Sequence, residues 1–419
     1  MIPEDWVVAR IDEYYDVISS KRVLQRDWKS RGVPFYRARE VAVLAEKGVV
    51  DNELFITEDL YLTLKSKYGV PKVGDALVTG IGTIGKVYTV SPDNMFYFKD
   101  ASVLWLKSRG GYSSEFLKQV FLTDIIVKQI KNSSMGTTVE TYTIQSAKKT
   151  LVPTPSLEEQ RAIATALSDV DALITALDKL IAKKRAIKTA AMQQLLTGKT
   201  RLPGFSGEWK TKRLGDYVKF FRNGTNSRSE LISEGKVKYL HYGDIHVNPN
   251  VYLDIGDTEI PCLPITKAKN LDRLRDGDLV FVDASEDQDG IGKSVEIVNV
   301  RDVEAVAGLH TIAARFDKSV LADGFKAFLQ YIPEFRRRLQ RLGAGTKVFA
   351  TNRAHIASAE IRLPPVEEQT AIAQVLSDMD AEIAALEARR DKTRAIKQGM
   401  MQQVLTGRVR LVKPEMEAC

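Results

Sequence analysis

The strongest constraint on this chain is an internal repeat of 48 residues. Residues 155–202 and 364–411 align without a gap at a constant offset of 209, and 28 of the 48 aligned positions are identical. Repetition on this scale predicts two copies of one structural unit rather than a single continuous fold.

Each copy of the repeat is predicted to form one long helix. Ser156 can cap the first copy, and Glu159 three residues later can complete a capping box. A Pro-Pro pair opens the second copy, and proline suits the first turn of a helix. Both copies end in Thr-Gly, which places Gly198 and Gly407 for a left-handed C-terminal cap.

The apolar residues of both copies recur in alternating steps of four and three, which is the spacing of a coiled-coil seam. They are Ile163, Leu167, Val170, Ile174, Leu177 and Ile181 in the first copy, and Ile372, Leu376, Met379, Ile383 and Leu386 in the second. In each copy acidic residues come early and basic residues late, so an antiparallel pair would place each acidic half beside a basic half. We therefore predict an antiparallel coiled coil with an internal pseudo-two-fold repeat. Two independent surface helices, or a homodimer seam, remain as alternatives.

The segments between the helices repeat a common plan with much weaker identity. Trp6 and Tyr14 match Trp209 and Tyr217 at an offset of 203. The order predicts an α+β protein in which two mixed α/β domains are separated by the two long helices. The expected segments are a first domain at 1–152, a helix at 153–202, a second domain at 203–361, a helix at 362–411 and a C-terminal tail at 412–419.

Local patterns within the first domain predict its elements. Residues 33–44 and 76–90 are rich in β-branched and aromatic residues and are predicted to form strands, and residues 113–131 are predicted to form a helix. A polar loop at 132–144 is expected to lead into a strand. Residues 80–85 fit Gly-x-Gly-x-x-Gly, but a strand pattern follows where a dinucleotide site needs a helix, so a β-hairpin is predicted.

Composition sets outer bounds on the function. Lys and Arg number 61 against 54 Asp and Glu, and the net charge of +7 is compatible with a polyanionic partner. Two distant cysteines, Cys262 and Cys419, favour a reduced, cytoplasmic setting. No signal peptide and no apolar run long enough to span a membrane are found.

Candidate chemical sites are few. His241 and His246 lie near Asp244, where a metal site, polar loops that read a nucleic acid and plain surface are all open interpretations. The sequence contains no convincing catalytic triad, no methyltransferase motif and no complete motor motif. We therefore expect that this chain catalyses no reaction alone.

The order of diverged domain, helix, diverged domain and helix, with Glu158-Glu159-Gln160 to Gly198 repeated as Glu367-Glu368-Gln369 to Gly407, resembles the specificity subunits of type I restriction-modification systems. The resemblance covers essentially the whole chain. It implies that each domain is a target recognition domain that reads one half of a split, asymmetric DNA sequence. It implies that the helices set the spacing of the two halves and dock two methyltransferase subunits, with restriction and motor subunits joining them. S-adenosylmethionine would be held by the methyltransferase partner, and ATP and Mg²⁺ by the restriction partner, so this chain is expected to bind no cofactor.

Candidate contacts with double-stranded DNA are taken from polar loops, and solvated surface is the alternative for each. In the first domain they are Lys21, Arg22, Tyr36, Arg37, Arg39 and Lys86. In the second they are Arg222, Asn223, Thr225, Asn226, Arg228, His241, Tyr242, His246, Lys293 and Lys347. The acidic stretch at 283–289 could accept from a cytosine amine or form a solvated turn. The candidates for partner docking, with core packing as the alternative, are Gln160, Gln193, Gln194, Gln369, Gln402 and Gln403.

Two rival functions are compatible with the same architecture. A stand-alone transcription regulator with two DNA-binding heads would bind its site tightly without partners. A structural adaptor would show a shallow dependence of DNA affinity on salt, if it bound DNA at all. Nearly identical helices beside diverged domains favour the specificity subunit over both.

Overall fold

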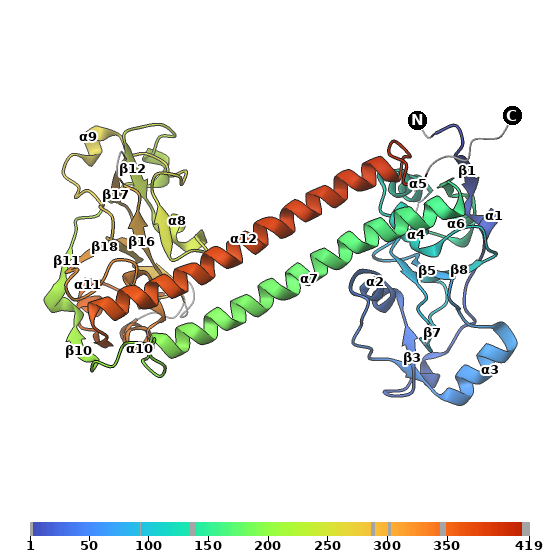
Figure 1. The fold of residues 1–419 in the computed structure, drawn as a ribbon, viewed down its shortest axis with the longest axis horizontal. Helices are drawn as coiled ribbons and strands as arrows, with labels where there is room; N and C mark the ends of the chain where they lie inside the picture. The colour runs from blue at the N-terminus through green and yellow to red at the C-terminus, as the bar shows by residue number, and fades with distance from the viewer. Residues whose placement is uncertain are drawn as a thin grey trace. The chain divides into compact units, whose positions relative to one another are not determined.

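The computed structural model describes residues 3–92, 94–133, 140–285, 290–300, 303–343 and 349–412. The chain divides into two compact units (Figure 1). The first contains Met1–Asp178 and Ala388–Cys419, and the second contains Lys179–Glu387. Each unit therefore consists of one globular head and parts of both long helices. We call residues 3–154 the first head and residues 206–363 the second head.

The two repeated stretches form helices of equal length. Helix α7 (Leu157–Leu195) and helix α12 (Val366–Val404) each span 39 residues. The predicted glycine caps are confirmed, because Gly198 and Gly407 adopt φ values of +69° and +70°. Ser156 caps α7 as predicted, since its hydroxyl accepts from the Glu159 amide at 3.2 Å. The Glu159 side chain binds other partners, described below, instead of completing the predicted capping box.

Within each unit the two helices run antiparallel, as the charge distribution predicted. In the first unit Lys397 pairs with Asp171 at 2.8 Å and Arg394 pairs with Asp178 at 3.0 Å. Residue numbers therefore rise along α7 in the direction in which they fall along α12. In the second unit Lys184 pairs with Glu382 at 2.6 Å, and Lys188 pairs with Asp380. The predicted seam is confirmed by burial at Leu177, Ile181 and Ile383, with 4%, 3% and 8% of each residue exposed.

The first head contains a four-stranded antiparallel sheet in the order β2-β8-β5-β6 and a smaller sheet in the order β4-β3-β7. Its elements are β1 (Val7–Arg10), α1 (Ile11–Tyr14), β2 (Tyr15–Ile18), η1 (Gln25–Asp27), β3 (Val33–Tyr36), α2 (Ala38–Lys47), β4 (Phe55–Ile56), α3 (Glu58–Tyr68), β5 (Ala76–Thr79), β6 (Val87–Thr89), β7 (Tyr97–Phe98), β8 (Val103–Ser108), α4 (Ser114–Val120), α5 (Asp124–Ser133), α6 (Ile144–Lys149) and β9 (Leu151–Thr154).

The second head repeats this plan with one more strand in its main sheet, whose order is β11-β18-β14-β16-β13. Its elements are β10 (Lys210–Arg213), η2 (Leu214–Tyr217), β11 (Val218–Phe220), η3 (Arg228–Glu230), β12 (Val237–Leu240), α8 (Tyr242–Val247), β13 (Tyr252–Asp254), α9 (Ile265–Ala268), β14 (Leu279–Val282), β15 (Ala284–Ser285), β16 (Ser294–Val298), β17 (Glu304–Ala307), β18 (Thr311–Phe316), η4 (Lys326–Tyr331), α10 (Pro333–Leu342), β19 (Phe349–Ala350), α11 (Arg353–Ala357) and β20 (Glu360–Leu363).

Both heads are closed by the same strand pair. In the first head β1 pairs antiparallel with β9, and in the second β10 pairs antiparallel with β20. Each pair brings the start of a head to the strand that leads directly into a long helix. The apolar core of each head then continues into both helices. Ile163 of α7 and Val404 of α12 join the first core, while Leu195 of α7 and Ile372 of α12 join the second.

Three local predictions were wrong in part. Residues 33–44 form strand β3 and then helix α2, because Val41, Leu44 and Ala45 share one buried helical face and Gly48 ends the helix with φ +73°. Residues 113–131 form two helices, since α4 ends at Val120 before Asp124 opens α5. Helix α6, not a strand, follows the polar loop, of which 134–139 lie outside the described residues. The hairpin predicted at 76–90 is confirmed by the antiparallel pairing of β5 with β6.

Candidate nucleic-acid interface and partner-docking surfaces

Two buried glutamines attach the helices to the heads. Gln160 is fully buried, its carbonyl accepts from the Ser113 amide at 2.8 Å, and its amide group donates to the Pro155 carbonyl at 2.9 Å. Gln369 makes the equivalent bonds to the Ala322 amide at 2.9 Å and the Pro364 carbonyl at 2.9 Å. These side chains have no surface to offer a partner. The docking role predicted for Gln160 and Gln369 is therefore wrong in this structure, and the packing alternative holds.

Two buried glutamates join the start of one helix to the end of the other. In the first unit Glu159, fully buried, accepts two bonds from Arg410 at 2.6 and 2.7 Å and one from the Trp6 indole at 3.2 Å. In the second unit Glu368 accepts two bonds at 2.5 Å from Arg201. Both arginines also lie 5.8 Å from the matching tryptophan ring. The residues that are identical in the two repeats therefore make the same contacts in both units. We call these bonds of Gln160, Gln369, Glu159 and Glu368 the scaffold contacts.

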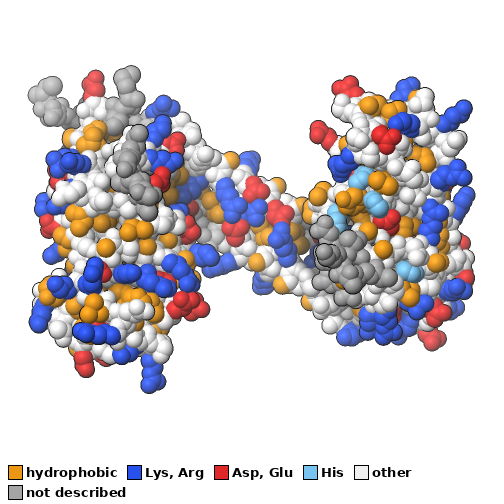
Figure 2. Space-filling view, turned by 180° about the vertical axis from the view of Figure 1, so that it is seen from behind, with side chains coloured by type: hydrophobic (Ala, Val, Ile, Leu, Met, Phe, Trp, Pro, Cys, Tyr) orange, Lys and Arg blue, Asp and Glu red, His pale blue; other side chains and the backbone are white. Residues whose placement is uncertain are grey.

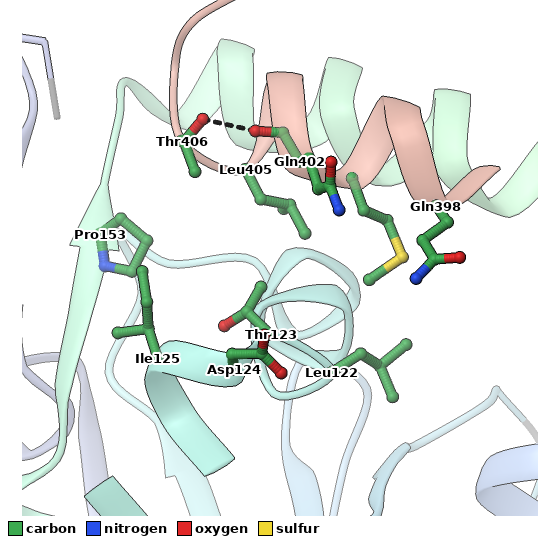
Figure 3. A pocket seen from close by; sticks show the side chains of 10 residues that line it. Leu122, Thr123, Asp124, Ile125, Pro153, Gln398, Gln402, Leu405 and Thr406 are labelled. Carbon is green, nitrogen blue, oxygen red and sulfur yellow. Dashed lines mark hydrogen bonds between the residues drawn. The ribbon is translucent and has the colours of Figure 1, made fainter. Parts of the chain in front are cut away.

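The remaining docking candidates are exposed. Gln193, Gln194, Gln402 and Gln403 all lie at the surface near the C-terminal ends of their helices. Figure 3 shows Gln402 at one wall of a groove in the first unit, with Leu122 and Ile125 on the other side. Leu122 and Ile125 are 46% and 51% exposed, so this groove has an open apolar lining.

In the first head most candidate DNA contacts are engaged within the chain. Tyr36 is only 5% exposed and stacks on Phe96 with the ring centroids 4.9 Å apart, so its predicted surface role is wrong. Tyr36 is buried because both faces of β3 are covered at this end: Phe35 packs in one apolar cluster and Tyr36 in another. The basic candidates pair as follows: Arg22 with Asp100, Arg37 with Glu40 and Glu53, Arg39 with Glu53, and Lys86 with Glu46. Lys21 lies 5.6 Å from the Tyr68 ring.

In the second head the candidates converge on one aromatic side chain. The Tyr242 ring lies 4.5 Å from His241, 6.4 Å from His246 and 5.7 Å from His310. We call these four residues the Tyr242 cluster. Figure 2 shows histidines gathered on one face of this head, among apolar side chains. His310 was not among the predicted residues, because it lies on the loop before β18, far from α8 in the sequence.

The Tyr242 cluster is held in place by hydrogen bonds at the start of α8. The His241 amide donates to Asp244 at 2.8 Å, and Arg228 donates to the same carboxylate at 2.9 Å. Burial, followed by the nearby charge of Arg228, lowers the pKa of His241 and favours its neutral form. His241 itself is only 7% exposed, so the direct DNA contact predicted for it is wrong on the same ground as for Tyr36. Its imidazole supports the Tyr242 ring, and its Nδ1 accepts from the Gly243 amide at 3.4 Å.

The loop before β12 and Lys293 are also held by contacts within the second head. Arg353 donates to the Asn223 side chain at 3.1 Å, and Asn226 donates to Glu230 at 3.0 Å. Lys293 donates to the His246 carbonyl at 2.6 Å, and burial lowers its pKa. The side chains of Arg222 and Thr225 are exposed. Lys347 and residues 286–289 of the acidic stretch lie outside the described residues.

The two heads use one backbone frame with different chemistry. In both, the residue before a helix donates its backbone amide to an acidic residue three positions later: Arg37 to Glu40 at 2.9 Å, and His241 to Asp244 at 2.8 Å. The first head places paired arginines at this helix start, and the second places aromatic and imidazole rings. If this edge contacts a ligand, the two heads cannot recognise the same one.

The described part of the chain contains neither a candidate metal site nor a candidate membrane-spanning helix. No group of three or more His, Cys, Asp or Glu in it is arranged to hold a metal ion. Within the same residues, no helix combines the length and apolarity needed to cross a membrane.

Comparison with known proteins agrees with this repeated architecture. The family model described as the type I restriction modification DNA specificity domain matches residues 3–188 and again residues 206–394. Each match takes in one head and most of the helix that follows it. The chain belongs to this family and carries two copies of its domain.

Individual relatives match along almost the whole chain. The putative type I restriction enzyme MjaX specificity subunit of Methanocaldococcus jannaschii is 25% identical over 433 residues, covering 98% of this chain and 95% of that protein. The MjaVIII specificity subunit of the same organism is 24% identical and covers 98% of this chain and 94% of its own. Among solved structures, the HsdS subunit from Thermoanaerobacter tengcongensis matches with a TM-score of 0.52 and 18% identity over 97% of this chain and 98% of that one. The S subunit from M. genitalium matches with a TM-score of 0.57 and 14% identity over 96% of both chains.

Proposed function

We propose that this chain is the DNA specificity subunit of a type I restriction-modification complex, in which each head reads one half of a bipartite, asymmetric DNA target. Membership of the family supports this function over a stand-alone regulator or a structural adaptor. The chain acts as a recognition subunit and leaves catalysis to its partners.

One observation carries the proposal: the scaffold contacts are repeated, whereas the edges that could meet DNA are not. The pairs Glu159–Arg410 and Glu368–Arg201 occupy matching places, as do Gln160 and Gln369. By contrast, the matching helix starts carry Arg37 in the first head and His241 in the second. Identical heads would read a palindrome, and diverged heads read two different half-sites.

Base readout in the second head is assigned to the Tyr242 cluster. Tyr242 is 37% exposed, so its ring and hydroxyl can meet a ligand while three imidazoles surround it. Exposed cations such as Lys21 and Arg222 contribute phosphate contacts, which position the protein without reading sequence.

The helices act as the spacer and as the docking surface for two methyltransferase subunits. The exposed Gln193, Gln194, Gln402 and Gln403 lie at equivalent places on α7 and α12, as two copies of one partner require. The groove beside Gln402 adds apolar surface to one of these places. S-adenosylmethionine is then supplied by the methyltransferase, and ATP and Mg²⁺ act in the restriction subunit.

Base-resolved mapping of adenine methylation in host DNA, with and without this gene, tests the proposal. The expected result is loss of methylation at one split, asymmetric motif. An unchanged methylation pattern in cells that express the methyltransferase would reject the specificity role and favour the stand-alone DNA-binding regulator.

A further inference from the structure

Helix α10 of the second head presents a strongly basic face. Its sequence, PEFRRRLQRL, places Phe335 and Leu339 four residues apart, and both are buried in the core of the head. Burial of that stripe turns Arg337, Arg338 and Arg341 outward, and all three are exposed. Figure 2 shows Lys and Arg side chains gathered at the lower edge of this head, where both β10 and α10 lie in Figure 1.

The charges of this face are poorly compensated. Among the described residues, Arg337 and Arg341 form no ion pair and no hydrogen bond, and Arg338 donates only to the Ser358 hydroxyl, at 3.2 Å. The three arginines line a surface hollow together with Ser358 and two acidic residues, Glu334 and Glu360. Glu334 also lies 4.0 Å from Arg362. Three like charges within about one helical turn repel one another, and an anion bound across them would relieve that repulsion.

The equivalent helix of the first head lacks this face. At an offset of 209, Lys128, Gln129 and Asn132 of α5 stand where α10 has Arg337, Arg338 and Arg341. Gln129 is used inside the head, because its side chain bonds both the carbonyl and the amide of Leu151, at 2.9 and 2.8 Å. The basic face is therefore a property of the second head and not of the shared frame.

Contacts connect α10 with the Tyr242 cluster. A Cβ at Gly292, two residues before β16, would lie 2.3 Å from a Leu339 methyl carbon, so the backbone at Gly292 is packed directly on α10. The next residue, Lys293, donates to the His246 carbonyl at 2.6 Å. This segment thus ties the basic helix to the side chains that we assign to base readout.

We propose that Arg337 and Arg341 of α10, with Arg338 beside them, bind the phosphodiester backbone of the DNA duplex next to the half-site read by the second head. This inference rests on the proposed function and adds a phosphate contact that is independent of base sequence. We call these three arginines the clamp. Arginine suits the task because its guanidinium stays charged and can engage two phosphate oxygens at once. The second head then contributes more to the salt dependence of binding than the first.

The double variant Arg337→Gln/Arg341→Gln in the full chain tests the clamp, with affinity for two duplexes of unrelated sequence measured between about 50 and 200 mM salt. Each phosphate contact contributes about 0.9 to the slope of log affinity against log salt, so the slope should fall by about 1.8. The loss of affinity should be equal for both duplexes. Neither arginine forms an ion pair or a hydrogen bond among the described residues, so the unfolding midpoint should stay at the parent value.

The matched control is Arg161→Gln/Arg389→Gln, which removes the same charge from exposed arginines of α7 and α12. A slope change in the α10 variant no larger than in this control would overturn the clamp. Weakened association with the methyltransferase at an unchanged DNA slope would also overturn it, in favour of an acidic protein partner. The slopes are independent of target recognition. Failure of the proposed function would instead appear as the absence of a methylated motif, whatever the slopes show.

Discussion

Arg410, six residues beyond the end of α12, binds Glu159 in the first turn of α7 with two hydrogen bonds of 2.6 and 2.7 Å. Its pseudo-equivalent in the second unit is Arg201, which binds Glu368 at the start of α12. Each pair fixes the end of one helix to the beginning of the other beside a tryptophan. The internal repeat is therefore preserved in a place where it holds two distant segments of the chain together.

Removing Arg410 should destabilise the first unit. Arg410→Ala leaves Glu159 fully buried with only the Trp6 indole as a side-chain partner, and an uncompensated buried charge costs about 3 kcal/mol. In chemical denaturation the first unit should unfold at a lower denaturant concentration than it does in the parent chain. Arg408→Ala, an exposed neighbour, is the control and should leave the transition in place. The double variant with Glu159→Gln should lose less than Arg410→Ala alone.

Gln369 should matter to stability because its side chain is buried and fully hydrogen-bonded inside the second unit. Gln369→Leu removes bonds to the Ala322 amide and to the Val320 and Pro364 carbonyls, each at 2.9 Å. A buried group left without a partner costs about 1–3 kcal/mol, so we expect a loss of at least 2 kcal/mol. Hydrogen exchange of the Ala322 amide should speed up as well. Gln374→Leu changes an exposed glutamine of the same helix and should do neither.

The second unit should lose stability as pH rises toward neutrality. Burial raises the pKa of Glu296 to about 7, despite bonds from the Gly324 and Ala327 amides at 2.7 and 3.0 Å. Because the folded chain then holds this proton more tightly than the unfolded chain, stability is highest below about pH 4.5 for this group and falls until about pH 7. The expected loss is about 2–3 kcal/mol.

Unfolding measured at pH 5 and pH 7.5 checks this dependence on Glu296. Glu296→Gln mimics the protonated side chain and should remove most of the fall. Glu360→Gln, at an exposed position, should retain it. Equal pH dependence in the parent and Glu296→Gln chains would show that this carboxyl does not titrate in the range.

Tyr242 should determine sequence preference and not overall affinity alone. Tyr242→Ala removes the ring that His241, His246 and His310 surround. A good base contact is worth about 1–3 kcal/mol of discrimination, so about tenfold or more of selectivity should be lost at one half-site. Competition binding with single-base variants of the target measures this. Tyr217→Ala, in the same head, should leave both half-sites unchanged.

The scaffold was predictable from the sequence because its signals are local and repeated. The spacing of Leu177 and Ile181 and the position of Gly198 each depend on one helix, and the charges of Asp171 and Lys397 follow from the antiparallel pairing of the two repeated helices. Burial, ion pairs and φ values bear them out. Repetition strengthened every one of these signals, since a pattern seen twice is less easily accidental.

The heads were harder to predict because their sites depend on contacts between distant segments. Tyr36 lies in a correctly predicted strand, but the sequence pattern does not show that both faces of that strand are covered. His310 reaches Tyr242 through the pairing of β12 with β17, whose last pair is Leu240 with Ala307, and it lies in a loop that carries no motif of its own. The low number of histidines, four in the chain, was the one available signal. Gln160 has the same weakness, since its role depends on the Ser113 amide in the head.

The most direct test of two heads reading two half-sites is to make the heads identical. Replacing residues 206–363 by residues 3–154 keeps the strand pair that closes each head, because β10 and β20 match β1 and β9. Adenine methylation is then mapped in cells that carry this chain with its methyltransferase, after co-purification shows that the complex assembles. The account predicts a palindromic motif, in which the half-site of the first head appears twice in inverted orientation. Methylation of the original asymmetric motif, or of a motif that shares neither half, would contradict it.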